Sequence, residues 1–303
     1  MPLTIPDKLP AIELLKKENI FVMDSLRAST QDIRPLKIAF LNLMPIKITT
    51  ETDLIRVMSN SPLQVEIEFL KLKSHTSKNT PIEHMMAFYS DFDKTKKYDG
   101  LIITGAPVEQ MEYNQVKYWK ELIGIFDWAK ANVTSTFFIC WSAQAALHHY
   151  YGIPKHQLAK KMFGVFEHTV NDPLNPIFRG FDDVFYVPHS RYTEVRREDI
   201  EKNPELTILS ESEDAGVYMV MARNGREFFV TGHSEYAPET LDVEYKRDLK
   251  KGLNIEIPKN YYLDNNPKKK PIVYWRSHAT LLFTNWLNYF VYQETPFNIE
   301  EIR

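Results

Sequence analysis

The sequence predicts an α/β fold in which helices flank a parallel, doubly wound sheet. Short apolar runs typical of buried strands recur in the first half of the chain, at residues 37–43, at 98–107 and just before Cys140. Segments whose apolar residues have helical spacing lie between these runs. Strands that alternate with helices in this order indicate a parallel sheet, and such sheets bind ligands at the carboxyl ends of their strands.

The first half of the chain justifies this prediction element by element. Residues 1–35 are expected to form an N-terminal arm with one short helix over 11–18, and residues 36–303 a single α/β domain, because no Gly/Ser-rich linker divides them. An alternating pattern adds a second strand over 64–71. Helices are predicted over 49–59, with Thr49 or Thr50 as the cap, over 115–131, and directly after Cys140.

The pattern changes after residue 180, where closely spaced strands follow one another. Strands are predicted at 183–187, 206–210, 216–222 and 227–231, as a mixed or antiparallel continuation of the sheet. A helix over 240–251, an exposed loop over 252–271 and an aromatic helical extension over 279–292 close the chain.

Composition excludes several classes of function. The 303 residues are 44% apolar and 25% charged, with a net charge of −3, which is ordinary for a soluble globular protein and argues against a nucleic-acid or membrane-surface binder. The Lys268–Lys270 run is predicted to be a solvated loop. One cysteine excludes an intrachain disulfide and a Cys-rich metal site. Without a visible secretory signal or a membrane-spanning apolar stretch, we expect a cytoplasmic enzyme or binding protein.

Cys140 stands where the hydrophobic pattern changes from a strand to a helix. At such a corner the thiol lies at the first N–H groups of the helix, where a thiolate is stabilised and reactive. A buried structural cysteine is the alternative, since free cysteine packs as a small hydrophobic residue.

A second chemical segment, Thr231–Tyr236, follows the apolar strand that ends near residue 231. Residues two apart in an extended chain point to the same side, so His233 and Glu235 are expected to emerge together. A Cys–His–carboxylate set needs one residue of each kind, and the chain supplies them at the ends of two apolar strands. A hydrogen-bonded loop histidine remains the alternative for His233.

Other motifs argue against a phosphate or metal site. The chain has no G-x-G-x-x-G, and the glycines at 100 and 105 are followed by Ala106-Pro107 where a phosphate-binding loop needs Lys and Ser or Thr. His148 and His149 are adjacent, so on a helix they point about 100° apart and do not share a face as metal ligands should. They are expected to face solvent or to pack.

Segments spread along the chain resemble one family, the homoserine O-acyltransferases of methionine biosynthesis. The resemblance covers about residues 5–297 and lies in the branch with a flavodoxin-like, class I glutamine-amidotransferase-like fold. The matching segments are Arg34–Pro45, Ser59–Val65, Thr104–Pro107, Cys140–Trp141, Pro188–Tyr192, Thr231–Tyr236, Trp275–His278 and Leu282–Tyr289.

This resemblance implies a ping-pong reaction without a bound cofactor or metal, in which acyl-CoA is a co-substrate and L-homoserine the acceptor. It implies that Cys140 is the nucleophile, His233 the general base, and Glu235 the residue that orients His233. The backbone N–H of Trp141 is a natural oxyanion donor, with a second donor expected near residues 104–106. The resemblance also implies a homodimer.

Positions in the family also assign substrate binding to Lys161, Ser190 and Arg247. The planar fork of Arg247 suits the carboxylate of an amino acid. Without the resemblance, each of the three would be taken for a surface residue.

In this family, the residue that follows Gly-Ala-Pro-x separates succinyl users from acetyl users, and here it is Glu109. A glutamate fills the space that a succinyl carboxylate needs and opposes it with a like charge. The sequence therefore predicts acetyl-CoA as the donor. If Glu109 is instead a solvated loop carboxylate, the donor stays open between acetyl and succinyl.

Two departures from the family pattern concern the catalytic segments. Related folds have glycines beside the nucleophile, where this chain has Phe138 and Ser142, so its turn is expected to be looser or differently packed. Several relatives have proline between the His and the Glu; Ser234 leaves this segment less rigid.

Three other functions remain open. A glutaminase or amidase on the same fold would use the same three residues, and a binding or regulatory module would keep the fold without chemistry. Serine or another hydroxyl amino acid could replace homoserine as the acceptor.

Overall fold

The computed structural model describes residues 3–4, 8–17, 22–23, 34–75, 77 and 79–303. Its strands are β1 (Leu3–Thr4), β2 (Val22–Met23), β3 (Leu36–Leu41), β4 (Val65–Lys71), β5 (Tyr89–Asp91), β6 (Tyr98–Ile103), β7 (Val133–Ile139), β8 (His156–Val170), β9 (Val184–Glu194), β10 (Leu206–Ser212), β11 (Gly216–Ala222) and β12 (Glu227–Val230).

The helices follow the same chain order. The α-helices are α1 (Ala11–Lys17), α3 (Lys47–Met58), α4 (Ile82–Phe88), α5 (Trp119–Asn132), α6 (Trp141–Tyr151), α7 (Arg197–Ile200), α8 (Thr240–Lys250) and α9 (Arg276–Asn285). Short 3-10 helices are η1 (Tyr113–Gln115), η2 (Pro176–Phe178), η3 (Arg223–Gly225), η4 (Leu263–Asn265) and η6 (Ile299–Glu301), and η5 (Trp286–Tyr292) is π-helical.

One sheet runs through the described part of the molecule, in the order β2-β1-β4-β3-β6-β7-β12-β11-β10-β8-β9. The strands from β2 to β12 pair in parallel, and those from β12 to β9 pair antiparallel. The succession β4-β3-β6-β7-β12 is the doubly wound order in which the second strand precedes the first. The predicted α/β class, with its antiparallel continuation, is therefore confirmed.

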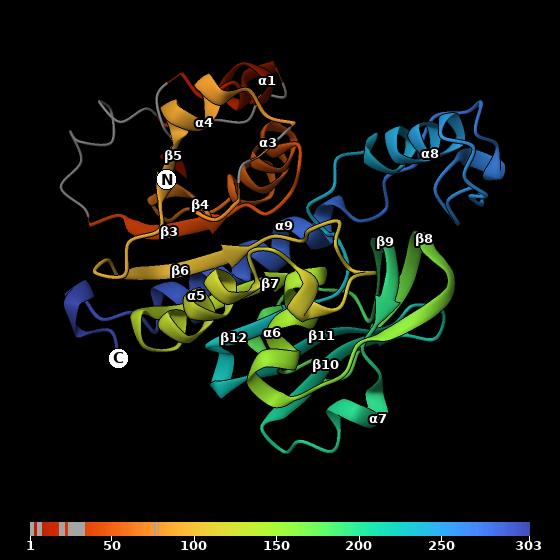
Figure 1. The fold of residues 1–303 in the computed structure, drawn as a ribbon. Coiled ribbons are helices and arrows are strands. Elements are labelled where there is room, and N and C mark those ends of the chain that lie inside the picture. The colour runs from red at the N-terminus through yellow and green to blue at the C-terminus, as the bar shows by residue number, and fades with distance from the viewer. Residues whose placement is uncertain (1–2, 5–7, 18–21, 24–33, 76, 78) are drawn as a thin grey trace.

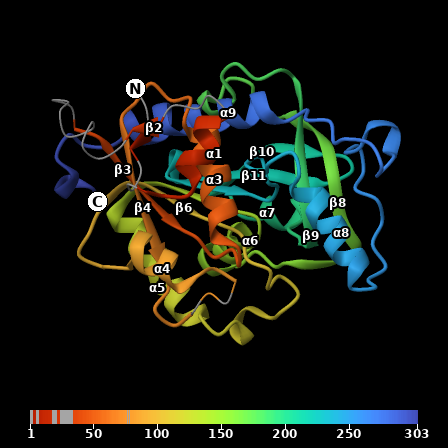
Figure 2. The same ribbon diagram turned by 90° about the horizontal axis from the view of Figure 1, so that it is seen from above.

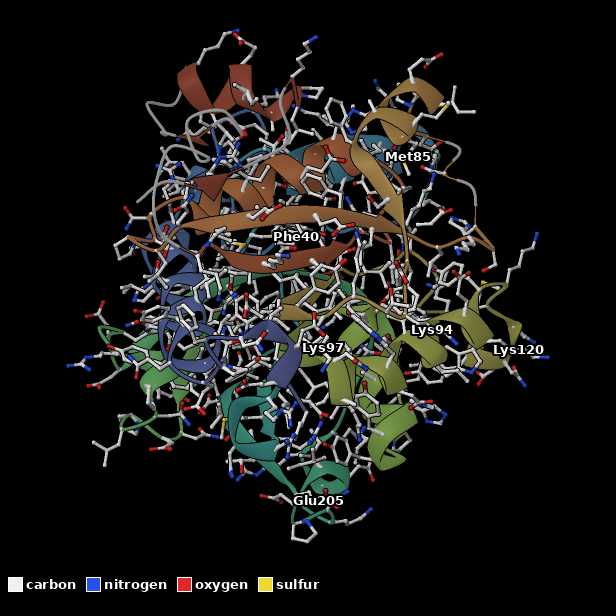
Figure 3. The ribbon with its side chains drawn as sticks, turned by 90° about the vertical axis from the view of Figure 1, so that its left-hand side faces the viewer. Phe40, Met85, Lys94, Lys97, Lys120 and Glu205 are labelled. Atoms are coloured by element: carbon white, nitrogen blue, oxygen red, sulfur yellow. The ribbon has the colours of Figure 1, made fainter. Side chains whose placement is uncertain are left out.

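Two helical layers cover the parallel part of the sheet (Figures 1 and 2). Helices α1, α3 and α9 pack on one face, against side chains such as Phe40 and Phe69, and α5 and α6 pack on the other. Figure 3 shows Phe40 in the interior, whereas Lys120 and Glu205 lie at the periphery. The doubly covered strands are consequently apolar on both faces, which is why the sequence reads there as short continuous apolar runs.

Strands β8 and β9 extend beyond the helical layers, and α8 lies beside their ends (Figure 1). Phe163, Tyr236, Leu241 and Trp275 belong to a small separate core in this region. Strand β8 was not predicted, because its first half is polar and half exposed and so lacks the apolar pattern of a core strand.

Several predicted boundaries need correction. Helix α3 begins at Lys47, and no side chain caps it, so the predicted Thr49 or Thr50 cap is wrong; Thr50 lies inside the helix and its hydroxyl bonds the Ile46 carbonyl at 3.5 Å. Helix α5 begins at Trp119 rather than at 115, after the 3-10 turn η1.

Other differences concern elements that were unforeseen or shifted. Helix α4 and strand β5 had not been predicted, and the closing helix begins at Arg276 rather than at 279. In the N-terminal segment, α1 lies where a helix was expected, and its predicted end at Glu18 lies outside the described residues. Strands β1 and β2 extend the sheet beyond β4.

Candidate active site

Cys140 forms a strained corner between β7 and α6. Its backbone has φ +54° and ψ −114°, a conformation that is costly for a residue with a Cβ atom. The N–H of Cys140 donates to the Val230 carbonyl at 2.6 Å, which ties the corner to β12. The thiol therefore lies at the N-terminus of α6, beside the first backbone N–H groups of the helix.

This corner is packed by side chains rather than by glycines. The Ile139 N–H donates to Ser142 Oγ at 3.0 Å, and that hydroxyl lies 2.7 Å from the Ile103 carbonyl oxygen. The ring of Phe138 stacks on Phe229 of β12 with centroids 5.1 Å apart. Ser142 and Phe138, the two residues that depart from the family pattern, therefore both pack this corner.

His233 and Glu235 follow β12, the neighbour of β7 in the sheet. Val230 is paired in parallel with Ile139, so both segments leave the sheet at the same edge. His233 Nδ1 lies 2.7 Å from Glu235 Oε1, and Cys140 and the imidazole both lie against Gly105. The structure thus brings together the three residues that the sequence singled out.

The charges around His233 favour its protonated form. Burial alone would lower the pKa of His233, but the nearby Cys140 and Glu235 act against it and hold that pKa well above its usual value. The ring of Tyr236 stacks on the imidazole at 4.1 Å between centroids and limits its rotation. The imidazole is therefore held in position beside the Cys140 thiol, as a general base for a nucleophile must be.

A cavity of about 780 Å³ opens over Cys140 and His233. Its walls come from the loops after β3 and β6, from β8 and β9, and from α8. A Cβ atom at Gly105 would lie 3.3 Å from Cys140 Cβ and 3.5 Å from His233 Cε1, so the glycine keeps space open beside the thiol.

Backbone groups near the thiol bear on the predicted oxyanion donors. Trp141 is the first residue of α6, and the first N–H groups of a helix have no partner within it. The Thr104 N–H donates to the Leu41 carbonyl at 3.1 Å. Within the 104–106 segment, this leaves Gly105 and Ala106 as candidates for the second donor.

Lys161, Ser190 and Arg247 all line the cavity, from β8, β9 and α8. Lys161 Nζ lies 3.2 Å from Glu244 Oε2 and 3.4 Å from Asp248 Oδ2. Ser190 Oγ donates to Glu244 at 2.5 Å, and Arg247 Nε donates to Asp248 at 2.7 Å. The three predicted residues are therefore joined through two acidic side chains.

Glu244 and Asp248 had not been predicted as site residues. They lie four residues apart on α8, so they share one face of a helix that the sequence had predicted. The i, i+4 spacing beside Arg247 was the available signal. The site consequently offers groups of both signs to a zwitterionic ligand.

Glu109 lines the same cavity and is held in place by β9. Its Oε2 accepts the Tyr192 N–H at 2.9 Å and lies 3.3 Å from Thr193 Oγ1. Burial raises the pKa of Glu109, while the hydrogen bonds from Tyr192 and Thr193 and the charge of Arg191 oppose the rise. Glu109 is therefore not a solvated loop carboxylate, because its side chain is held by Tyr192 and Thr193.

The remaining sequence candidates lie away from this cavity. His148 stacks on Tyr113 with centroids 4.6 Å apart, and His149 Nε2 lies 2.7 Å from Asp127. Lys268–Lys270 is exposed. Within the described residues, no group of three His, Cys, Asp or Glu side chains is placed to hold a metal ion, and no helix is long and apolar enough to cross a bilayer.

Comparison with known families accounts for these features together. The family model described as Homoserine O-succinyltransferase matches residues 2–297. The chain belongs to this family. The resemblance noted in the sequence is thereby confirmed, and the protein is an acyltransferase.

Similar curated proteins carry the acetyl name. Proteins named Homoserine O-acetyltransferase from Bacteroides fragilis and Bacteroides thetaiotaomicron are 72% and 71% identical, and each match covers 100% of both chains. A protein of the same name from Acetivibrio thermocellus is 63% identical, again over 100% of both chains.

Solved structures of glutamine amidotransferases share the fold. One from Thermotoga maritima has a TM-score of 0.54 at 14% identity and covers 86% of this chain and 100% of its own. One from Methylobacillus flagellatus has a TM-score of 0.51 at 10% identity, with coverages of 85% and 95%. These matches confirm the predicted glutamine-amidotransferase-like fold.

Proposed function

We propose that this protein is a homoserine O-acetyltransferase that moves the acetyl group of acetyl-CoA to L-homoserine through a thioester on Cys140. The observation that carries the proposal is the meeting of Cys140 with the hydrogen-bonded His233–Glu235 pair at a cavity that Glu109 also lines, in a chain of this family. The product would be O-acetylhomoserine, for methionine biosynthesis.

In the first half-reaction, the Cys140 thiolate attacks the thioester carbonyl of acetyl-CoA. A new C–S bond forms to Cys140, the C–S bond to CoA breaks, and the departing CoA thiolate takes the proton of the His233 imidazolium. The developing oxyanion would be stabilised by the Trp141 N–H at the start of α6. One thioester replaces another, so the exchange has little thermodynamic cost.

In the second half-reaction, neutral His233 removes the proton of the homoserine hydroxyl as that oxygen attacks the acetyl-enzyme. The C–O bond forms, the C–S bond to Cys140 breaks, and the thiolate–imidazolium pair is restored. Glu235 fixes the imidazole orientation through Nδ1 and stabilises its cation.

The polar walls of the cavity suit the two charges of L-homoserine. Half of the Arg247 side chain is exposed, and its guanidinium would bind the substrate carboxylate. Lys161 and Ser190 already contact Glu244, so this carboxylate is fixed in position to receive the ammonium group. Binding at both ends would aim the side-chain hydroxyl toward His233.

The donor assignment rests on Glu109 and on the acetyl name of the similar proteins. A succinyl group would bring a second carboxylate to the wall that Glu109 occupies, and desolvating two like charges there is unfavourable. Succinyl-CoA is the alternative donor, because the matched family takes its description from the succinyl reaction.

The test is intact mass spectrometry of the protein after brief mixing with acetyl-CoA or succinyl-CoA, followed by a chase with homoserine or serine. We expect one acetyl group on Cys140, lost on the homoserine chase as O-acetylhomoserine forms, and no adduct on Cys140→Ala. A succinyl adduct would reverse the donor assignment, and loss of the adduct to serine would change the acceptor. The absence of any adduct, with glutamine hydrolysed instead, would favour an amidase.

We further propose that the protein acts in the cytoplasm as a homodimer, with no bound cofactor or metal and no nucleic-acid or membrane partner. These properties are supported by family membership and by the ordinary composition of the chain. Sedimentation of the purified protein tests the dimer, and retained activity after treatment with a chelator tests the absence of a metal.

A further inference from the structure

The lysine that follows α6, Lys155, holds the backbone of the loop that carries Glu109. This Glu109 loop, residues 107–111, comes after β6 and lines the substrate cavity. Lys155 Nζ donates to the Glu109 carbonyl at 2.8 Å and also to the Met111 carbonyl. The Glu109 carboxylate is held separately, by the Tyr192 N–H of β9 at 2.9 Å. Two different parts of the fold therefore fix the two ends of one residue.

An aromatic stack gives the Lys155 ammonium group a defined place. Nζ lies 4.7 Å from the ring centroid of Tyr113, and the face of an aromatic ring attracts a cation. Tyr113 is itself stacked on Trp119 and on His148, with centroid distances of 5.0 and 4.6 Å. An ammonium group has three donors, and two carbonyls and a ring face can accept all three. The molecule thus has a built site for this ammonium group.

The end of α6 determines where Lys155 lies. Gly152 ends the helix with φ +70°, a left-handed conformation common at helix ends, and its N–H donates to the His148 carbonyl at 3.0 Å. Ile153, the next residue, is buried. Lys155 is therefore placed by the same helix that begins directly after Cys140, so the nucleophile and the Glu109 loop share one support.

We propose that Lys155 is a positioning residue for the choice of acyl donor, which holds the backbone of the Glu109 loop so that the Glu109 carboxylate stays at the cavity wall. This inference rests on the proposed function, because it concerns the acyl donor of that reaction. Lys155 is not among the described residues that line the substrate cavity, so it acts through Glu109 rather than on the acyl group. Without it, the carboxylate could move away from a succinyl group and oppose it less.

Three single substitutions separate the hydrogen bonds of Lys155 from its bulk. Lys155→Met keeps a long side chain over Tyr113 and removes every donor, whereas Lys155→Arg keeps the charge and can still donate to both carbonyls. Lys130→Met is the matched control, because Lys130 is also half-buried and its Nζ lies 4.0 Å from the ring centroid of Tyr150, away from the Glu109 loop.

The experiment measures kcat/KM for succinyl-CoA and for acetyl-CoA, together with KM for homoserine. We expect Lys155→Met to raise the succinyl-to-acetyl ratio by about 5-fold or more, since loss of a hydrogen bond from a charged donor is worth at least a factor of this size. KM for homoserine should stay unchanged. Lys155→Arg should restore most of the discrimination, and Lys130→Met should match the wild type.

A double variant tests whether Lys155 works through Glu109. In a Glu109→Gly background no carboxylate remains to be positioned, so adding Lys155→Met should leave the succinyl-to-acetyl ratio where Glu109→Gly alone puts it. A further rise in the double variant would show that Lys155 acts independently of Glu109 and would overturn the inference.

The single variant can overturn the inference as well. If Lys155→Met changes kcat/KM for the two donors by the same factor, or changes neither, then Lys155 does not set donor choice. Failure of the proposed function gives a different result, because the wild-type protein itself would then form no O-acetylhomoserine from acetyl-CoA.

Discussion

His233 Nδ1 lies 2.7 Å from Glu235 Oε1, while the same imidazole lies beside Cys140. Because Nδ1 is engaged by Glu235, Nε2 is the ring nitrogen that remains to exchange a proton with the thiol. Glu235 and Cys140 also place negative charge on either side of a buried imidazole, and this charge outweighs the cost of burying a cation.

Replacing Glu235 with glutamine should therefore slow the reaction while a side chain of the same shape stays beside His233. The amide keeps the shape but removes one of the two negative charges that raise the pKa of His233, so the imidazolium becomes less stable. We expect kcat to fall by at least about 10-fold, because loss of the orienting carboxylate in such triads is costly. Steady-state kinetics and the pH dependence of Cys140 alkylation provide the measurement. An unchanged alkylation profile would show that Glu235 does not tune the pair.

The catalytic pair was predictable because it depends on local pattern. Cys140 and His233 both follow short apolar runs, and adjacent parallel strands present their carboxyl ends at one edge. The β4-β3-β6-β7-β12 core followed from the same signals, since strands covered on both faces are continuously apolar.

The acidic side of the substrate cavity was not predicted, because it depends on tertiary placement. Glu244 and Asp248 look like ordinary surface residues of α8, and only the extension of β8 and β9 toward that helix brings Lys161 and Ser190 to them.

The Glu109 side chain should set donor choice through both its size and its charge. Glu109→Gly opens space and removes a carboxylate that β9 holds at the cavity wall. We expect the ratio of kcat/KM for succinyl-CoA to that for acetyl-CoA to rise by at least about 10-fold, because the repulsion between Glu109 and the succinyl carboxylate is removed. Glu109→Gln keeps the volume without the charge and should give a smaller rise. Equal ratios in all three proteins would place donor selection elsewhere.

The backbone strain at Cys140 predicts an ordering of stabilities among inactive variants. With φ at +54°, alanine keeps the steric cost of a Cβ atom, whereas glycine relieves it. We expect the free energy of unfolding of Cys140→Gly to be about 1 kcal/mol larger than that of Cys140→Ala, although glycine normally destabilises a folded protein relative to alanine. Urea denaturation of the two variants measures this difference. A more stable alanine variant would contradict strain at the corner.

Two buried histidines, His168 and His189, should make the fold sensitive to acid. The His168 Nδ1–H donates to the Phe166 carbonyl, and His189 Nδ1 accepts from Arg191 Nε at 3.3 Å, so each ring has one nitrogen fixed. The two Nε2 atoms lie 3.1 Å apart, which requires His189 to donate to His168 with both rings neutral. Burial lowers the pKa of His168 to about 3, and burial with the charge of Arg191 lowers that of His189 well below its usual value.

These lowered pKa values make the folded protein less stable as the pH falls. The unfolded histidines bind protons below about pH 6.5 and the folded ones do not, so stability is fully present above that pH and is lost as the pH falls toward the folded pKa values. Each histidine should remove about 2 kcal/mol from the free energy of unfolding between pH 6.5 and pH 5. Urea denaturation should therefore show a shallower loss in His168→Gln than in the wild type over this range. Between pH 7 and pH 8 the stabilities of the two proteins should change in parallel, because the rings are then neutral in both the folded and the unfolded state. Parallel changes at acid pH as well would mean that His168 is already protonated in the folded protein.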